Sequence, residues 1–317
     1  MKPKKDQILS LLKEKTIISG ETIAKELTIS RTAVWKHIQN LKKEGYKIQS
    51  IRQKGYKLQD LPEIPIAEIK QRLSYSSLWH SLQYYPEVTS TNETVKDLAK
   101  KNHPEGTVII AGVQTKGRGR RQRRWTSTKG GLWFSVLYRP ILPPQKAMIV
   151  TMATSIAITQ TIRSITGIDV HIKWPNDILY KGKKICGILT ELSAEMDQIT
   201  YMIIGIGINV NNTLPDDLND TATTIKTIRS QKISLADLLT RSLENLDEWY
   251  EHVKKHDTRL IQQRWLEYSD TIGKHVQIKD GDTVIEGIAK GITENGGLII
   301  ETKEGMKQIV SGDISYL

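Results

Sequence analysis

The 317-residue sequence lacks several features that would each place it in a special class of proteins. It has a single cysteine, Cys186, so it cannot form an internal disulfide and gives no sign of an oxidising compartment. It has no run of about 18 or more apolar residues, and its basic start leads into an amphipathic segment without the apolar core of a signal peptide. These absences favour a cytoplasmic protein with no membrane partner.

Positive charge is concentrated at the N-terminal end of the chain. Residues 1–60 hold 14 Lys or Arg and 6 Asp or Glu, which gives them +8 of the total net charge of +11. The chain length fits two or three domains. The asymmetry is typical of a polyanion-binding module attached to a nearly neutral body, although a basic surface facing solvent gives the same composition.

The first 60 residues show the spacing of a helix-turn-helix. Apolar residues recur at helical spacing in Ile8–Leu12 and again in Ile23–Leu27, and Ser19 is a candidate N-cap for the second helix. Thr28 then begins a tight connection where many such motifs have glycine, and Ser30 caps a third helix. The buried face of that helix is expected to consist of Val34, Ile38 and Leu41.

The opposite face of the third helix carries side chains that suit contacts with DNA bases and phosphates. The predicted DNA-binding residues are Arg31, Thr32, Trp35, Lys36 and Gln39. Trp35 fits a core position equally well. Two alternating segments, Tyr46–Ile51 and Tyr56–Leu58, flank a basic turn and predict a small hairpin. We therefore predict a winged helix-turn-helix domain over residues 1–64, with its boundary in the stiff linker 61–65.

The rest of the chain predicts two further domains, so the fold class is α+β. Strands are predicted near residues 107–113, 131–138, 170–174, 185–193 and 201–209. With helices near 92–101 and 147–165, they indicate a mixed α/β domain over residues 65–270. Short strands separated by turns such as Asp280-Gly281 predict a small SH3-like β-barrel over residues 271–317. This last module is either a cap over a site or a structural appendage.

An arginine-rich loop follows the first predicted strand of the central domain. Five arginines lie within the seven residues Arg118–Arg124. Gly117 directly precedes them, and Gly119 lies among them. Glycines let a backbone approach an anion closely, and guanidinium groups match phosphate or carboxylate oxygens in pairs. The loop is therefore a candidate phosphate cradle; a solvated basic loop and a second nucleic-acid patch are the alternatives.

Two other regions, residues 173–191 and 205–209, carry candidate functional residues. In Lys173–Asp177, Asp177 is either a metal ligand or part of a turn with Asn176. Lys184 starts an apolar strand, so its ammonium is expected to project into a pocket as a fixed positive charge. In Gly205–Asn209, alternate glycines remove side chains from one face of a strand, which makes either a slot for a flat ligand or a tight packing contact.

Taken in order, Gly117–Arg121, Lys173–Asp177 and Gly205–Asn209 resemble the motifs of biotin protein ligases, and the N-terminal module resembles that of the bifunctional bacterial members. The resemblance spans essentially the whole chain. It implies that biotin carboxylate attacks the α-phosphorus of MgATP, and that a lysine of a biotin carboxyl carrier protein domain then attacks biotinyl-5′-AMP. It also implies a biotin-responsive repressor that binds operator DNA as a homodimer promoted by biotinyl-5′-AMP.

The resemblance also implies the site residues. The expected biotin and adenylate contacts are Ser90, Thr91, Asn92, Gln114, Gly117, Arg118, Gly119, Arg120, Arg123, Trp125, Lys184, Gly187, Gly205, Gly207 and Asn209. Lys184, Arg118 and Arg120 are the expected catalytic residues, and Asp177 is the candidate Mg²⁺ ligand. One departure is Gln122, where some members have glycine.

The implied chemistry requires no protein nucleophile, because positioning and electrostatic stabilisation can carry the phosphoryl step. Cys186 is expected to be buried and inert, so we reject a thioester mechanism. Two rival functions are a lipoate ligase and a non-enzymatic, ligand-sensing repressor. Lys184 together with the arginine-rich loop favours an enzyme over a sensor, because sensing alone does not require phosphate chemistry.

Overall fold

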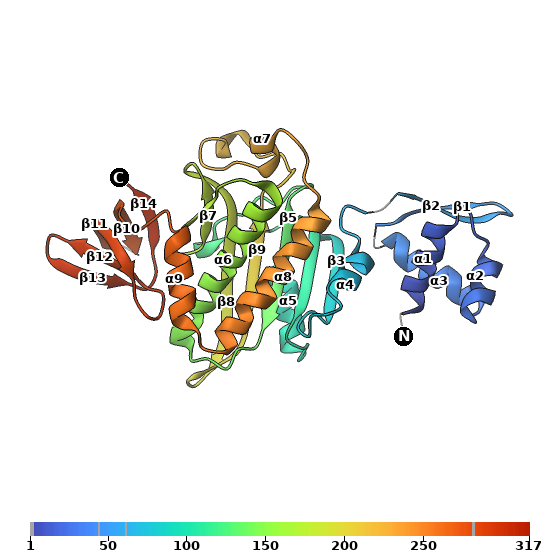
Figure 1. The fold of residues 1–317 in the computed structure, drawn as a ribbon, viewed down its shortest axis with the longest axis horizontal. Coiled ribbons are helices and arrows are strands. Elements are labelled where there is room, and N and C mark those ends of the chain that lie inside the picture. Colours follow the sequence, from blue (N-terminus) through green and yellow to red (C-terminus); the bar gives the residue numbers. More distant parts are fainter. Residues whose placement is uncertain (1–2, 44, 61, 281–282) are drawn as a thin grey trace.

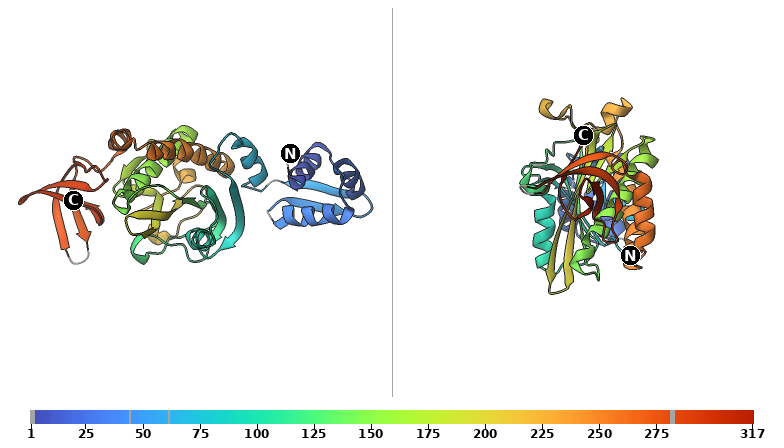
Figure 2. Two further views of the ribbon diagram at one scale, coloured as in Figure 1. Left: turned by 90° about the horizontal axis from the view of Figure 1, so that it is seen from below. Right: turned by 90° about the vertical axis from the view of Figure 1, so that its left-hand side faces the viewer.

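The structure, a computed structural model, describes residues 3–43, 45–60, 62–280 and 283–317. Three units follow one another along the long axis of the molecule, with the N-terminal and C-terminal units at opposite ends (Figures 1 and 2). The predicted α+β fold class is confirmed. Two predicted features, the start of the linker at Leu61 and the turn at Gly281, lie outside the described residues.

The N-terminal unit is the predicted set of three helices and a hairpin. Its elements are α1 (Lys4–Glu14), α2 (Gly20–Leu27), α3 (Arg31–Lys43), β1 (Lys47–Ile51) and β2 (Gly55–Asp60). Both predicted caps are present: the Ser19 hydroxyl accepts a hydrogen bond from Thr22 N–H at 3.0 Å, and the Ser30 hydroxyl accepts one from Ala33 N–H at 3.1 Å. Thr28 ends α2 with a φ of 54°, a left-handed conformation that explains the frequent glycine there.

The central unit is built on a seven-stranded sheet with the order β3-β4-β5-β9-β8-β7-β6. Its strands are β3 (Ser81–Val88), β4 (Thr107–Gln114), β5 (Leu132–Tyr138), β6 (His171–Lys173), β7 (Asp177–Tyr180), β8 (Lys183–Glu195) and β9 (Gln198–Ile208). Only the β3–β4 pair is parallel among the described pairings of this sheet. The sequence analysis did not anticipate β3 or β7.

Helices cover both faces of this sheet. They are α4 (Ile66–Arg72), α5 (Thr91–Lys100), α6 (Ala147–Thr166), α8 (Leu235–Lys254) and α9 (Thr258–Tyr268), whereas α7 (Ile225–Arg229) lies beyond one end of the strands (Figure 1). Alternation along β4 separates the two faces, since Val108 and Ile110 pack in the main core with α6 and α8, and Ile109 packs with α5. The end-on view shows α5 and α8 on opposite sides of the sheet (Figure 2).

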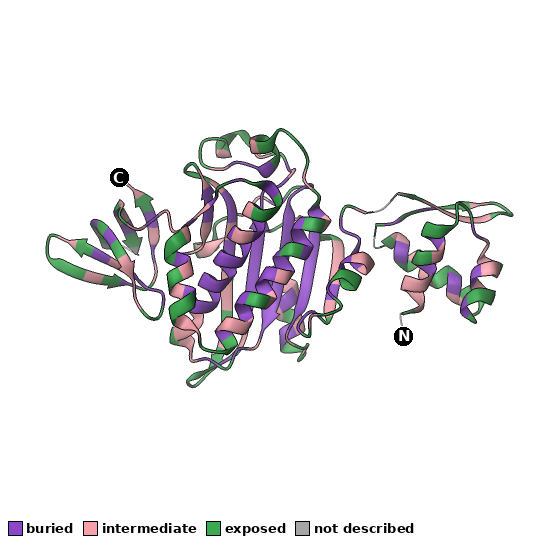
Figure 3. Cartoon of the chain, in the orientation of Figure 1, coloured by how far each residue is buried: buried purple, intermediate pink, exposed green. Residues whose placement is uncertain are grey.

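Helix α6 is the central core helix. The segment Pro144–Thr166 is long and apolar enough to cross a membrane by length and composition, but 72% of its most apolar window is buried inside the protein. The helix lies against the sheet among other buried elements (Figure 3). Its apolar character is therefore explained by its place in the core.

The C-terminal unit is a five-stranded antiparallel sheet with the order β13-β12-β11-β10-β14. Its strands are β10 (His275–Asp280), β11 (Thr283–Ile292), β12 (Leu298–Thr302), β13 (Gly305–Ile309) and β14 (Asp313–Tyr316). Trp174 of the central unit is buried at the junction, where its Nε1 donates to the carbonyl oxygen of Gly296 at 3.1 Å. The predicted small β module is thus present and continuous with the central unit.

Candidate functional site

A cavity of about 400 Å³ gathers almost all of the predicted site residues. The predicted residues that line it are Ser90, Thr91, Asn92, Gln114, Arg118, Gly119, Arg120, Arg123, Trp125, Asp177, Lys184, Gly187, Gly205, Gly207 and Asn209. Gly117 does not line the cavity; a Cβ there would lie 2.4 Å from the carbonyl oxygen of Trp125. The C-terminal unit contributes Gly312 and Asp313 to the wall.

The polar floor of the cavity is formed by the start of α5 and the end of β4. Thr91 N–H donates to Gln114 Oε1 at 2.8 Å, and Gln114 Nε2 donates to the Ser127 hydroxyl at 2.8 Å. Behind the floor, the buried Ser135 hydroxyl contacts both Thr91 Oγ1 and Asn92 Oδ1 at 2.6 Å. The amide of Asn92 is therefore engaged by the protein itself.

Sequence analysis did not identify two residues that hold this floor. Asn92 Nδ2 donates to Glu191 Oε2 at 2.7 Å, and Glu191 lies in β8, 99 residues further along the chain. Ser135 lies in β5, in an apolar strand that gave no sign of a polar role. Neither residue belongs to a motif, so only the folded arrangement reveals them.

The alternate glycines face side chains of this chain. A Cβ on Gly205 would lie 2.2 Å from Asn92 Oδ1, and one on Gly207 would lie 2.4 Å from Trp125 Nε1. A Cβ on Gly187 would lie 3.0 Å from both the Trp125 ring and Lys184 Cε. The glycines thus provide space for Asn92 and for the Trp125 indole, as the tight-packing alternative expects at these positions.

Trp125 has an unsatisfied polar atom in this arrangement. Its Nε1 is buried, and within the described parts of the chain no hydrogen-bond acceptor reaches it. A buried donor without a partner is costly, at about 1–3 kcal/mol. The indole therefore has a free donor to offer to a ligand acceptor in the cavity.

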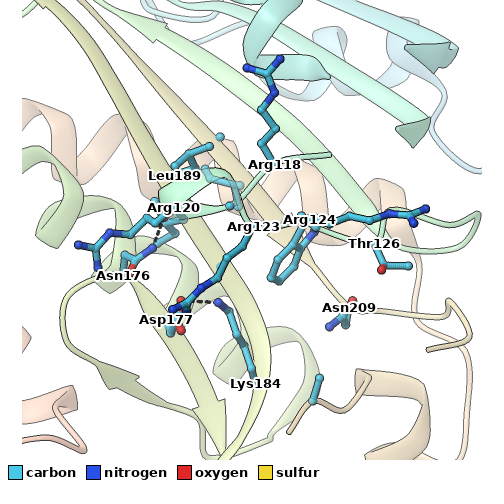
Figure 4. Close-up of a pocket in the computed structure, with 18 of the residues that line it drawn as sticks. Arg118, Arg120, Arg123, Arg124, Thr126, Asn176, Asp177, Lys184, Leu189 and Asn209 are labelled. Carbon is cyan, nitrogen blue, oxygen red and sulfur yellow. Dashed lines mark hydrogen bonds and ion pairs between the residues drawn. The ribbon is translucent and has the colours of Figure 1, made fainter. Parts of the chain in front are cut away.

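Lys184 and Asp177 form an ion pair on the cavity wall. Lys184 Nζ lies 2.6 Å from Asp177 Oδ1 and 5.0 Å from the ring centroid of Trp125, and Figure 4 shows the pair on neighbouring strands. Asp177 begins β7 opposite Lys173. Burial lowers the pKa of Lys173, although Asp177 opposes this shift. The wall thus combines two cations and one carboxylate.

The arginine-rich loop contacts the C-terminal unit. Arg120 Nη1 donates to the carbonyl oxygen of Gly312 at 3.0 Å, and Arg123 forms an ion pair with Asp313. Arg121 Nη1 lies 3.7 Å from the same carboxylate. Burial lowers the pKa of Arg120, against the opposing effect of Asp313. Several guanidinium groups are therefore held together by backbone and carboxylate oxygens.

Arg118 has a different orientation from the other predicted catalytic residues. Its guanidinium forms an ion pair with Glu93 at 2.8 Å and points away from the Asp177–Lys184 pair (Figure 4). Within the same loop, Arg121 and Gln122 have φ values of 51° and 62°. These left-handed conformations favour glycine, which agrees with the glycine that some related loops have at the Gln122 position.

Cys186 lies close to Lys184 in the sequence, but its thiol takes no part in the chemistry of this site. Cys186 is a residue of β8 whose thiol is fully buried in the core, and burial raises its pKa well above the usual range. Because the thiolate is the reactive form, this cysteine is inert in the folded protein.

The predicted DNA-binding residues lie on α3, away from the cavity. Arg31, Thr32 and Lys36 are exposed, and Gln39 is half-buried. Trp35 is 53% exposed, so it does not belong to the core of this unit. The face that sequence analysis assigned to DNA is therefore accessible.

Comparisons with known proteins agree with each of the three units. Family models match residues 4–57 (HTH domain), 84–209 (biotin/lipoate A/B protein ligase family) and 271–317 (biotin protein ligase C terminal domain). The solved structure of the biotin protein ligase from Aquifex aeolicus in complex with biotin and ATP matches with a TM-score of 0.65 and 33% identity, covering 75% of this chain and 98% of that one.

Curated relatives match over nearly the full length. The bifunctional ligase/repressor BirA of Bacillus subtilis (strain 168) is 42% identical over 302 residues, which cover 94% of this chain and 93% of the relative. The protein of the same name from Escherichia coli (strain K12) is 30% identical, with 98% and 96% covered. The chain therefore belongs to the family of bifunctional ligase/repressors, within the wider biotin/lipoate A/B protein ligase family.

Proposed function

We propose that this protein is an ATP-dependent biotin–[acetyl-CoA-carboxylase] ligase that also represses biotin genes through its N-terminal unit. The observation that carries the ligase proposal is the cavity in which a polar floor, an unpartnered Trp125 donor, Lys184 and the arginine-rich loop lie together. A ligand with an uncharged polar ring at one end and a phosphate at the other suits this combination. The Aquifex relative, solved with biotin and ATP, supports the same choice of substrates.

In the first step, an oxygen of the biotin carboxylate attacks the α-phosphorus of ATP. A new P–O bond forms, the bond between the α-phosphorus and the bridging oxygen breaks, and pyrophosphate leaves with biotinyl-5′-AMP as the product. Negative charge builds up on the phosphate oxygens, and Lys184 with Arg120 stabilises it from the wall. Arg118 joins them once it releases Glu93, and Arg123 and Trp125 close over the adenylate.

In the second step, the ε-amine of a lysine on the biotin carboxyl carrier protein domain attacks the acyl carbonyl of the adenylate. A C–N bond forms, the bond between the acyl carbon and the phosphate oxygen breaks, AMP leaves with the electron pair, and the attacking nitrogen loses a proton to water. The protein supplies position and charge rather than a nucleophile. The burial of Cys186 is consistent with this route.

Mg²⁺ is proposed as a partner of ATP rather than as a resident metal. Among the described residues, no group of three or more His, Cys, Asp or Glu side chains could hold a metal ion. Mg²⁺ commonly binds through one carboxylate and substrate phosphates, and Asp177 supplies one carboxylate on the cavity wall. When bound, the ion would neutralise phosphate charge, with Asp177 as its protein ligand in place of Lys184.

DNA binding by the N-terminal unit is coupled to adenylate binding in the ligase unit. The exposed α3 residues contact operator DNA. One such module makes a small interface and binds weakly, so an operator with two-fold symmetry is bound by a dimer. Biotinyl-5′-AMP promotes this homodimer, so ligand binding and DNA binding are thermodynamically linked. Abundant acceptor consumes the adenylate and relieves repression. We also propose a cytoplasmic location, because this protein would act on both DNA and acetyl-CoA carboxylase.

The decisive experiment for the ligase uses the full chain, biotin, ATP labelled at the α-phosphate and a biotin carboxyl carrier protein domain. We expect labelled biotinyl-5′-AMP, followed by biotin on the acceptor lysine. A parallel reaction with lipoate tests the nearest rival enzyme. Transfer of lipoate but not biotin, or ligand binding without either product, would overturn the proposal.

The regulatory part needs a separate measurement. Sedimentation of the full chain with and without biotin plus ATP, paired with DNA-binding titrations, should show a shift to dimer and tighter operator binding together. An unchanged association state, with operator affinity indifferent to the ligand, would remove the regulatory proposal and leave the ligase intact.

A further inference from the structure

A chain of short hydrogen bonds runs behind the cavity floor and ends at a carboxylate. Thr91 Oγ1 lies 2.6 Å from Ser135 Oγ, which lies 2.6 Å from Asn92 Oδ1, and Asn92 Nδ2 lies 2.7 Å from Glu191 Oε2. Thr91, Ser135 and Asn92 are all buried. Glu191 and Ser135 do not line the cavity, so they act on it only through the floor residues.

The carboxylate gives this chain a direction. A carboxylate only accepts hydrogen bonds, so the amide nitrogen of Asn92 must face Glu191 and its oxygen must face Ser135. Because that oxygen also only accepts, the single hydroxyl proton of Ser135 must point to Asn92. The 2.6 Å contact between Ser135 and Thr91 then requires the Thr91 hydroxyl to donate.

This direction determines what the floor presents to a ligand. The Thr91 hydroxyl is used on Ser135, and its alternative acceptor, Gln114 Oε1, is further away at 3.1 Å. Gln114 Oε1 therefore receives one hydrogen bond, from Thr91 N–H, and keeps a lone pair. Gln114 lines the cavity, so this lone pair is an acceptor for an N–H group of a bound ring.

We propose that Glu191 is a positioning residue: through Asn92 and Ser135 it keeps Gln114 an acceptor, and so makes the floor specific for the N–H groups of a cyclic urea. The inference rests on the proposed biotin-binding function and assigns roles to two residues outside the sequence motifs. The effect depends on the direction of the hydrogen bonds, which shape and burial do not determine.

The substitution Glu191→Gln tests this direction with little change in size. A glutamine can donate to the Asn92 oxygen, which allows the Asn92 amide to turn over. Asn92 then donates to Ser135, Ser135 donates to Thr91, and Thr91 donates to Gln114 Oε1. Both lone pairs of that oxygen are then used within the protein, and the ligand N–H loses its acceptor.

The experiment measures the dissociation constant for biotin by calorimetry without ATP, and KM for both substrates in the ligase reaction. We expect E191Q to weaken biotin binding by about three- to tenfold, the effect of one hydrogen bond. KM for ATP and the melting temperature should be unchanged. The matched control is Glu195→Gln, on the same strand but exposed, which should leave biotin binding unchanged.

A double-mutant cycle with Ser135→Ala separates positioning from packing. Removing the middle of the chain should weaken biotin binding by itself, and adding E191Q to S135A should then have no further effect. Biotin affinity unchanged in E191Q, equal increases in KM for biotin and ATP, or additive effects of the two substitutions would each overturn the inference. Failure of the unmodified protein to bind biotin would instead overturn the proposed function.

Discussion

The two ends of the chain carry small units that are joined to the ligase unit in different ways. The N-terminal unit has its own core, which includes Ile8, Ile23 and Ile38, and an ion pair of 2.6 Å between Lys13 and Glu68 links it to α4. The buried residues of the C-terminal unit instead belong to the same apolar cluster as the central sheet. One end is a separate module, whereas the other is part of the body of the enzyme.

Deleting each end should therefore have opposite consequences, and this is the largest expected effect. Loss of residues 271–317 exposes Trp174 and removes the partners of the arginine-rich loop. Exposing one large buried side chain costs about 1.5–3 kcal/mol, a sizeable part of a typical stability of about 5–15 kcal/mol. We expect residues 1–270 to lose cooperative unfolding of the ligase unit, measured by circular dichroism, and all adenylate formation.

The matching deletion removes residues 1–64. We expect residues 65–317 to keep a cooperative unfolding transition and to lose specific operator binding, since the clustered basic charge and α3 are gone. Salt-sensitive binding of the operator by residues 65–317, or a folded and active 1–270, would remove the distinction between the two ends.

Lys184→Ala should lower the activity of the ligase unit and leave the N-terminal unit unaffected. An electrostatic contact of this kind is worth about 10²–10³ in rate, so biotin-dependent pyrophosphate release should fall by that factor. DNA binding without ligand should be unchanged, because α3 lies outside the cavity. The control is Lys181→Ala, an exposed neighbour on the same hairpin. Near-normal pyrophosphate release by the variant would contradict the role of Lys184.

The buried thiol predicts a pH effect confined to the ligase unit. Burial raises the pKa of Cys186, while the unfolded thiol ionises near pH 8.5. The native state therefore holds a proton that the unfolded state loses, so stability is unaffected below about pH 8.5 and falls above it by up to about 1.4 kcal/mol per pH unit. Urea unfolding at pH 7.5 and 9.5 should show a smaller loss for Cys186→Ala than for the unmodified protein; equal losses would disprove this.

The smallest expected effect belongs to the N-terminal core. Thr28 has a φ of 54°, which costs about 1–2 kcal/mol for a residue with a Cβ, partly offset by the greater freedom of an unfolded glycine. Thr28→Gly should stabilise this unit by about 0.5–1 kcal/mol. Hydrogen exchange should slow in α1 to α3 and stay constant in the central sheet, and Thr28→Ala should bring no gain. Slower exchange in both cores would mean that they are not separate.

Sequence reasoning succeeded where the signals were local. The caps Ser19 and Ser30 and the hairpin at residues 47–60 lie within a few residues of the structures they define. The long helix α8 was not predicted, although Leu235, Leu239 and Leu246 repeat at helical spacing and are a local signal for it. The strand β7 has no such signal, since it is only four residues long and its first residue, Asp177, fits a turn or a metal site equally well.

The residues of the candidate site also differ in whether a local sequence signal indicates them. The arginine-rich loop, Lys184 and the alternate glycines lie in short sequence motifs, which are visible without the fold. Ser135, Glu191 and Asp313 stand alone in strands or loops, and they meet the cavity residues only across long separations in sequence. Their roles depend on hydrogen-bond direction and on sheet order, which local spacing does not encode.

The hydrogen bond between Trp174 and Gly296 joins residues 122 positions apart, and this affects how each molecule matures during translation. At about 5–20 residues per second, a ribosome needs roughly 6–24 s to add the partner after Trp174 has been made. The N-terminal unit has all of its core within the first 60 residues and can fold well before that point. Each new molecule therefore has a folded DNA-binding unit while its ligase unit is still an incomplete nascent chain. The apolar surface of that unit is then exposed to chaperones and to aggregation.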